Sequence, residues 1–197
     1  QKASVSFSNQ AIKVMSDNVA GVLPGNKRPD EYIIYTAHWD HFGVNPSLEG
    51  DSIFNGALDN ATGTAALIEL AEAFISLPTR QDRSIIFLAV TGEEQGLLGS
   101  RFYVSEPLVP LNKTIGVINM DALNITGKTR DMTMIGIGMS DLDEYMTGVL
   151  EKYGRYATPD LFAEQGGFFR SDHFCFAEAG FAVLYPSWGV DDGEGGM

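Results

Sequence analysis

The sequence IIFLAVTGEE, residues 85–94, places an unbroken apolar run just before two adjacent carboxylates. Two further runs have the same character, YIIYTA at residues 32–37 and IGVINM at residues 115–120. All three runs are short, rich in Ile, Val or aromatic side chains, and do not alternate with polar residues. That pattern is typical of central strands that are covered on both faces of a sheet.

The segments around these runs alternate between strand and helix patterns. Further strands are predicted at Val19–Leu23, Met132–Ile137 and Phe181–Tyr185, and helices at Thr62–Leu77, Gly96–Val104, Asp141–Tyr153 and Ser171–Ala179. This alternation predicts an α/β domain with a largely parallel sheet. We expect loops at residues 23–30 and 43–55, an irregular tail at 189–197, and a pair of strands within residues 1–16.

Composition narrows the class of protein. A chain of 197 residues suits one domain, and 26 acids against 13 bases give a net charge of −13. Nucleic acid binding is not expected, because phosphates favour a basic face. No apolar stretch is long enough to span a membrane. The single cysteine, Cys175, excludes an internal disulfide, and its apolar neighbours predict a small buried side chain.

Metal-type ligands follow each of the three strong strands. His38 comes directly after the first run, Glu93 and Glu94 come shortly after the second, and Asp121 ends the third. Ligands bind at the carboxyl edge of such sheets, and Asp59 lies just before the first predicted helix. Imidazole and carboxylate groups are standard zinc ligands. A bridging carboxylate can hold two ions that activate water, while a second carboxylate accepts its proton.

Five motifs in this order resemble those of the co-catalytic zinc aminopeptidases, a family that includes glutamate carboxypeptidases and is related to glutaminyl cyclases. The motifs are His38-x-Asp40-His41, Asp59-Asn60-Ala61-x-Gly63, Glu93-Glu94-x-Gly96-Leu97-Leu98-Gly99-Ser100, Asn119-x-Asp121 and Ser171-Asp172-His173. They span most of the chain, from Asp30 to about Ser187, and the Glu-Glu block is the most specific of them. The resemblance implies an αβα sandwich with a mixed, largely parallel central sheet.

The resemblance also implies two zinc ions and a ligand set for them. His38 and Asp121 would bind one zinc, Glu94 would bind the other, and Asp59 would bridge both. In the family a second histidine completes the second zinc site from a loop after the last matched strand. No such histidine is found here. The histidine is therefore expected to lie past Met197, with residues 1–197 as one catalytic domain of a longer protein, or else to be absent, and the start at Gln1 is compatible with an upstream segment.

Two further residues receive roles from the resemblance. Glu93 would be the general base toward the bridging water, and Asp40 would orient His38. The peptide bond between Asp59 and Asn60 would be cis. For His41 and His173, structural roles or roles in supporting the ligands are favoured over direct ligation of a metal. The family's oxyanion-stabilising tyrosine corresponds to Phe168, which has no hydroxyl.

The function predicted from these features is that of a zinc-dependent exopeptidase of the aminopeptidase type, acting on peptide or aminoacyl substrates. Two alternatives stay open: a glutaminyl cyclase with one zinc, and an inactive peptidase-like domain that binds partners. The paired His38 and Asp40 argue against the cyclase, and four of five ligands argue for an enzyme. The resemblance favours a secreted or periplasmic location. Residue specificity, aminopeptidase against carboxypeptidase action, substrate-binding residues and oligomeric state are open.

Overall fold

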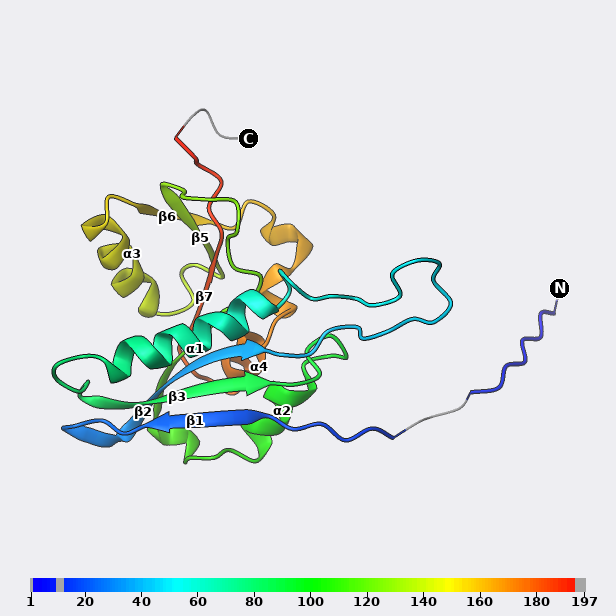
Figure 1. The fold of residues 1–197 in the computed structure, drawn as a ribbon, viewed down its shortest axis with the longest axis horizontal. Coiled ribbons are helices and arrows are strands. Elements are labelled where there is room, and N and C mark those ends of the chain that lie inside the picture. Colours follow the sequence, from blue (N-terminus) through cyan, green and yellow to red (C-terminus); the bar gives the residue numbers. More distant parts are fainter. Residues whose placement is uncertain (1, 10–12, 194–197) are drawn as a thin grey trace.

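The computed structural model describes residues 2–9 and 13–193, and the strands found there form one mixed sheet (Figure 1). The strands are β1 (Val19–Leu23), β2 (Arg28–His38), β3 (Arg83–Val90), β4 (Thr114–Asn119), β5 (Asp131–Ile135), β6 (Tyr156–Pro159) and β7 (Val183–Ser187). Their order across the sheet is β1-β3-β2-β4-β7-β5-β6. Only the β1–β3 and β5–β7 pairs of this described sheet are antiparallel. The predicted mixed, largely parallel sheet is confirmed.

Helices cover both faces of the sheet, as an αβα sandwich requires. They are α1 (Ala61–Ile75), α2 (Leu98–Ser105), α3 (Leu142–Lys152) and α4 (His173–Glu178), with short 3-10 turns η1 (Leu111–Lys113), η2 (Ala163–Gln165) and η3 (Gly167–Phe169). Ile34 of β2 packs with Tyr103 of α2 and Phe176 of α4 in one buried cluster. Ala37 of the same strand packs with Leu67 of α1 in another. Because side chains alternate along a strand, these clusters lie on opposite faces.

The strand predictions need three corrections. The strand pair expected within residues 1–16 is wrong for residues 2–9 and 13–16, which form no strand, while residues 1 and 10–12 lie outside the described residues. β2 begins at Arg28, inside the loop predicted at residues 23–30. β6 was not predicted. It is a short strand at the end of the sheet, partly exposed and ending at Pro159, so it lacks the buried apolar run that marks β2, β3 and β4.

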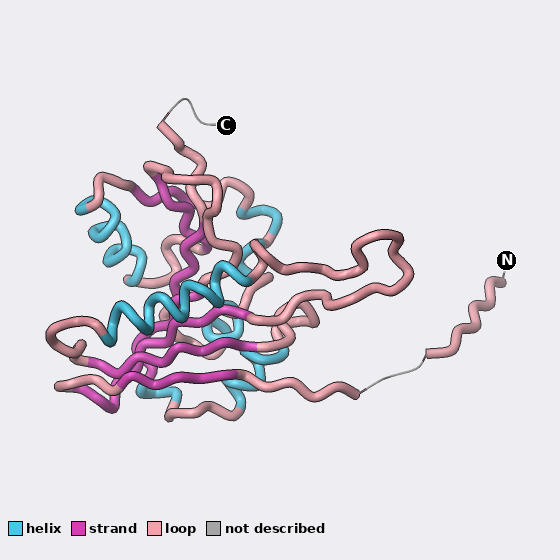
Figure 2. The backbone as a smooth tube through the Cα atoms, viewed as in Figure 1, coloured by secondary structure: helices cyan, strands magenta, loops and turns pink. Residues whose placement is uncertain are grey.

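The loop between β2 and α1 shapes the surroundings of the candidate site. Residues 43–55 were predicted as a loop, and they contain only the isolated bridge between Val44 and Ile53. Figure 2 shows this loop projecting beyond the end of the sheet. The tail is irregular at residues 189–193, and its residues 194–197 lie outside the described residues. Cys175 is buried, as predicted. No helix in the described ranges is long and apolar enough to cross a bilayer.

Candidate metal centre

The carboxyl ends of β2, β3 and β4 meet at one edge of the sheet. The parallel register pairs His38 of β2 with Val90 of β3, and Thr36 of β2 with Asn119 of β4. Glu93 and Glu94 follow β3, and Asp121 follows β4. The apolar runs therefore bring the predicted polar residues to one place because parallel strands end on the same side.

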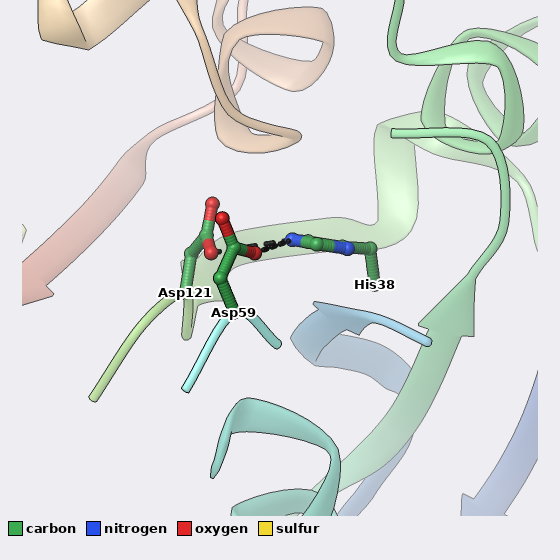
Figure 3. A group of neighbouring side chains, drawn as sticks. All are labelled: His38, Asp59 and Asp121. Atoms are coloured by element: carbon green, nitrogen blue, oxygen red, sulfur yellow. Dashed lines mark hydrogen bonds and ion pairs between the residues drawn. The ribbon is translucent and has the colours of Figure 1, made fainter. Parts of the chain in front are cut away.

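A first group of metal-type ligands lies at this edge (Figure 3). The Nε2 atom of His38 lies 3.0 Å from Oδ1 of Asp59 and 3.2 Å from Oδ1 of Asp121. A single ring nitrogen holds at most one proton, so it cannot satisfy both carboxylates. Two ligand atoms at about 2.0–2.1 Å from a tetrahedral zinc ion lie about 3.3 Å apart. The spacing of the three side chains thus suits a shared cation better than it suits hydrogen bonds among the side chains themselves.

Hydrogen bonds fix two of these three ligands. The second carboxylate oxygen of Asp121 accepts a 2.6 Å hydrogen bond from the hydroxyl of Ser171, and Asn119 donates to that hydroxyl at 2.7 Å. Nδ1 of His38 lies 3.1 Å from the backbone carbonyl oxygen of Asp40. Donation from Nδ1 to this carbonyl leaves Nε2 of the neutral ring free to bind a metal.

The carboxylate of Asp40 contacts a different part of the site. Its Oδ1 atom lies 3.8 Å from Nδ1 of His38, beyond hydrogen-bond distance. Oδ1 instead accepts a 3.1 Å hydrogen bond from the backbone N–H of Glu93, and Oδ2 accepts a 3.4 Å bond from that of Glu94. Asp40 therefore orients His38 through its main chain, and its side chain holds the turn that presents the two glutamates.

Asn60 joins the turn of Asp59 to the turn that follows β4. Its amide group donates to the carbonyl of Met120 at 3.0 Å, while its side-chain oxygen accepts from Gly63 N at 2.9 Å and Ala122 N at 3.2 Å. The bond between Asp59 and Asn60 is cis, as the family resemblance implies. Asn60 is the cap of α1, and this side chain sets Asp59 beside Asp121.

Gly63 permits this close approach of α1 to the end of β4. A Cβ atom at Gly63 would lie 2.3 Å from the backbone oxygen of Met120 and 2.5 Å from Oδ1 of Asn60. We therefore expect Gly63→Ala to lower the free energy of unfolding by about 3 kcal/mol, the upper end of overpacking costs. Urea denaturation followed by circular dichroism measures this change.

Gly148 is the matched control for this prediction. It lies in α3, and a Cβ atom there would meet nothing within 4 Å. Gly148→Ala should raise the free energy of unfolding by about 0.5–1 kcal/mol, because alanine loses less backbone entropy in a helix. Equal shifts in the two variants would show that the contact between α1 and β4 is not tight.

A second group of metal-type ligands adjoins the first. His41, Asp59 and Glu94 each offer one ligand atom, and these atoms lie within 4.8 Å of one another. Nδ1 of His41 contacts Oε1 of Glu94 at 2.6 Å. Asp59 belongs to both groups, which is the arrangement that a carboxylate bridging two cations requires.

The charges at the first group alter two pKa values in the metal-free protein. Burial alone would lower the pKa of His38, but its hydrogen bond with Asp121 and nearby carboxylates raise it to about 10. Burial would raise the pKa of Asp121, but hydrogen bonds from His38 and Ser171 lower it below its usual value. His38 is therefore protonated at neutral pH until a cation displaces the proton.

Zinc binding at this group is thus expected to release about one proton at pH 8. His38 has a pKa of about 10 without metal, whereas a histidine at the ordinary value of 6.5 would release almost none. Affinity should rise about tenfold per pH unit from pH 7 to 9, because fewer His38 side chains must lose a proton as pH rises. Calorimetry in buffers of different ionisation enthalpy counts the protons.

The Asp121→Ala variant serves as the control for this titration. It removes the hydrogen bond that raises the pKa of His38, so its remaining zinc binding should release clearly less than one proton at pH 8. The interpretation fails if the unmodified protein releases no protons while it binds zinc.

Glu93 stands beside these ligands as a carboxylic group with an altered pKa. Burial raises the pKa of Glu93 to about 8, and the charges of Asp172, Asp121 and Glu94 add to that rise against the opposing effect of His38. A group with a pKa near the working pH can both accept and return a proton. Glu93 is in neither ligand group, so it is free to do so.

His173 lies in the interior, next to the partly buried Phe168. The ring of His173 is fully buried, with ring centroids 4.9 Å from Phe168 and 4.5 Å from Tyr185. Burial lowers the pKa of His173 to about 4. His173 belongs to neither ligand group among the described residues, and its structural role stays a prediction.

The sequence pattern alone did not identify the residues that support the site. Asn60 and Ser171 lie inside the quoted motifs, yet their hydrogen bonds to the turns around Asp121 became visible only in the fold. Tyr185, in the middle of β7, packs on His173, and burial raises its pKa. Its only signal in the sequence is its place at the end of the last predicted strand.

The fold and the site define an αβα protein with a carboxylate-rich centre at the carboxyl edge of its sheet. Residues 18–193 match the model of peptidase family M28, and the chain belongs to that family. Aminopeptidase YwaD of Bacillus subtilis (strain 168) is 28% identical over 201 residues, which cover 95% of this chain and 38% of the relative. Aminopeptidase NAALADL1 of Mus musculus is 35% identical over 125 residues, 61% of this chain and 15% of the relative.

Solved structures of similar proteins agree with the fold. BSAP, a zinc aminopeptidase from Bacillus subtilis, superposes with a TM-score of 0.67 and 29% identity, covering 91% of this chain and 41% of that one. LapB from Legionella pneumophila gives a TM-score of 0.66 at 26% identity, covering 86% of this chain and 44% of that one. The chain thus spans less than half the length of these relatives.

Proposed function

We propose that the protein is a zinc-dependent aminopeptidase that hydrolyses the first peptide bond of substrates with a free N-terminus. The observation that supports this most is the pair of adjacent ligand groups that share Asp59, with Glu93 beside them. The relative named as an aminopeptidase supports the choice of reaction, and the solved structure of a zinc aminopeptidase supports the choice of reaction and of metal.

In this proposal, His38, Asp59 and Asp121 would hold one zinc ion, and Asp59 and Glu94 would hold the other. When bound, the zinc pair supplies an acidified water and a polarised substrate carbonyl. Asp40 keeps the turn of Glu93 and Glu94 in place through the two backbone N–H groups. Ser171 and the main chain of Asp40 hold Asp121 and His38 in the orientation for binding.

Glu93 performs the proton transfers in this proposal. One of its carboxylate oxygens accepts a proton from the attacking water, and the same group then donates that proton to the nitrogen of the leaving amine. The raised pKa of Glu93, caused first by burial, suits the return of the proton. Nearby zinc ions would stabilise its ionised form and lower that pKa, so Glu93 can begin the cycle as a base.

A substrate panel tests this proposal. An aminoacyl anilide with a free α-amino group should be hydrolysed, and its N-acetylated counterpart should not. Activity should disappear with a chelator and return with zinc. Cleavage of the C-terminal residue of an N-blocked peptide would indicate carboxypeptidase action instead. Cyclisation of an N-terminal glutamine without hydrolysis would indicate a glutaminyl cyclase. Zinc binding without turnover of any substrate would favour a binding domain.

A further inference from the structure

The loop between β2 and α1 exposes large apolar side chains next to the metal centre. Five of them are at least 40% exposed, namely Phe42, Val44, Leu48, Ile53 and Phe54. Apolar side chains that cluster on a protein surface mark interaction sites. The two ligand groups include no residue of this loop between positions 42 and 55. The exposed side chains are therefore available for a role other than metal binding.

Backbone hydrogen bonds give the loop the shape of a hairpin. The N–H of Phe54 donates to the carbonyl of Gly43 at 2.8 Å, and the N–H of Asn45 donates to the carbonyl of Ser52 at 2.8 Å. An isolated antiparallel bridge lies between these two bonds. A loop that is already ordered presents its side chains without the entropy cost of ordering them during binding.

Phe42 and Phe54 form an aromatic pair at the base of this hairpin. Their ring centroids lie 5.8 Å apart at an interplanar angle of 67°, an edge-to-face contact. The Phe42 centroid also lies 4.9 Å from that of the His41 ring, and Nδ1 of His41 contacts Oε1 of Glu94 at 2.6 Å. One imidazole ring thus separates the aromatic pair from Glu94.

The two ends of the loop hold the aromatic pair beside the metal centre. His41 precedes the loop and Asp59 follows it, and both belong to the second ligand group. A Cβ atom on Gly56 would lie 3.2 Å from both Cβ and Cγ of His41, so the returning backbone packs directly on that side chain. From this point the loop projects beyond the end of the sheet (Figure 2). A peptide whose scissile carbonyl lies at the centre can therefore continue along the loop.

The chemistry of the loop suits the residue that follows the scissile bond. The first residue of an aminopeptidase substrate carries an ammonium group, which needs oxygen acceptors that phenyl rings lack. An extended peptide advances about 3.3–3.6 Å per residue, so the second residue reaches beyond the groups that hold the scissile carbonyl. Both charged residues of the loop, Glu49 and Asp51, are acidic and disfavour an acidic side chain. A large apolar side chain matches the aromatic pair.

We propose that Phe42 and Phe54 bind the side chain of the second substrate residue and give the enzyme a preference for a large apolar residue there. This inference rests on the proposed aminopeptidase function and deepens it by assigning specificity on the leaving side of the peptide bond. The contact is remote from the reacting atoms and binds substrate and transition state alike. It therefore acts on KM rather than on kcat.

Two peptides with the same first residue test the preference. Hydrolysis of leucyl-phenylalanine amide should have a kcat/KM about tenfold above that of leucyl-alanine amide, the scale of discrimination by an apolar pocket. In the double variant Phe42→Ala, Phe54→Ala this ratio should fall to about one, through a higher KM for the phenylalanine peptide at unchanged kcat. A ratio that survives in the double variant would overturn the inference.

Tyr145→Ala is the matched control for the double variant. It also removes an exposed aromatic ring, 71% accessible, but from α3. The ratio of the two kcat/KM values should stay unchanged in this variant. An equal loss of preference in Tyr145→Ala would show that the effect does not come from the aromatic pair.

Photochemical cross-linking tests the same inference without turnover. The probe is a peptide with a reduced scissile bond, which cannot be hydrolysed, and with a benzophenone side chain on its first or its second residue. Mass spectrometry should find the label of the second residue within residues 42–54 and that of the first residue elsewhere. Labelling of residues 42–54 from the first residue, or no labelling there from the second, would overturn the inference. Absence of zinc-dependent hydrolysis of every peptide would instead contradict the proposed function, while the labelling pattern still decides the inference.

Discussion

The Glu93→Gln substitution is expected to lower kcat by about 10²–10⁴-fold while the zinc content stays unchanged. Glutamine keeps the shape of the side chain but cannot accept the proton of the attacking water. Glu93 lies outside both ligand groups, so the substitution removes no ligand of the metal. Steady-state hydrolysis of an aminoacyl anilide, together with metal analysis of the same sample, separates the two effects.

The neighbouring Glu94→Gln variant is the matched control. It makes the same chemical change one residue along the chain, but Glu94 belongs to the second ligand group. This variant should lose zinc as well as activity. If Glu93→Gln keeps nearly full kcat, or if it loses zinc, then the roles of the two glutamates have been assigned in the wrong order.

The Asp59→Ala substitution is expected to weaken both cation sites at once. Structural zinc binding of about 10–16 kcal/mol shared among four ligands gives about 3 kcal/mol per ligand, or about 100-fold in affinity. Asp59 is the residue common to both groups, so both dissociation constants should rise by about this factor. Competition titrations against a chromophoric chelator measure the two constants.

Asp121→Ala provides the comparison for this second prediction. Asp121 belongs only to the first group, so one dissociation constant should rise while the other changes little. A loss of affinity at a single site in Asp59→Ala would mean that this carboxylate does not bridge.

The centre of the sheet could be predicted from the sequence because its strands are buried on both faces. Ile34 and Ile86 are fully buried in neighbouring parallel strands, and strands of this kind appear as unbroken apolar runs. The strand at Tyr156–Pro159 escaped prediction because its exposed residues leave no such run. Its position depends on pairing with β5, a contact that local sequence does not encode.

The candidate site also has a part that the sequence predicts and a part that it does not. His38 ends β2, and Glu94 and Asp121 come after β3 and β4, so the parallel register alone predicts that they meet at one edge. The contact of His41 with Glu94 depends on how residues 42–58 fold back toward α1. The one local signal for that path is Gly56, whose positive φ of 64° and close packing on His41 explain a glycine there.

The measurement that tests the account most directly is an anomalous difference map from zinc-soaked crystals, recorded on both sides of the zinc absorption edge. The account predicts two peaks about 3.5–4 Å apart on either side of the Asp59 carboxylate. One peak should contact His38 and Asp121, and the other should contact Glu94. A single peak, or peaks that do not share Asp59, would contradict the two-cation centre on which the proposed function depends.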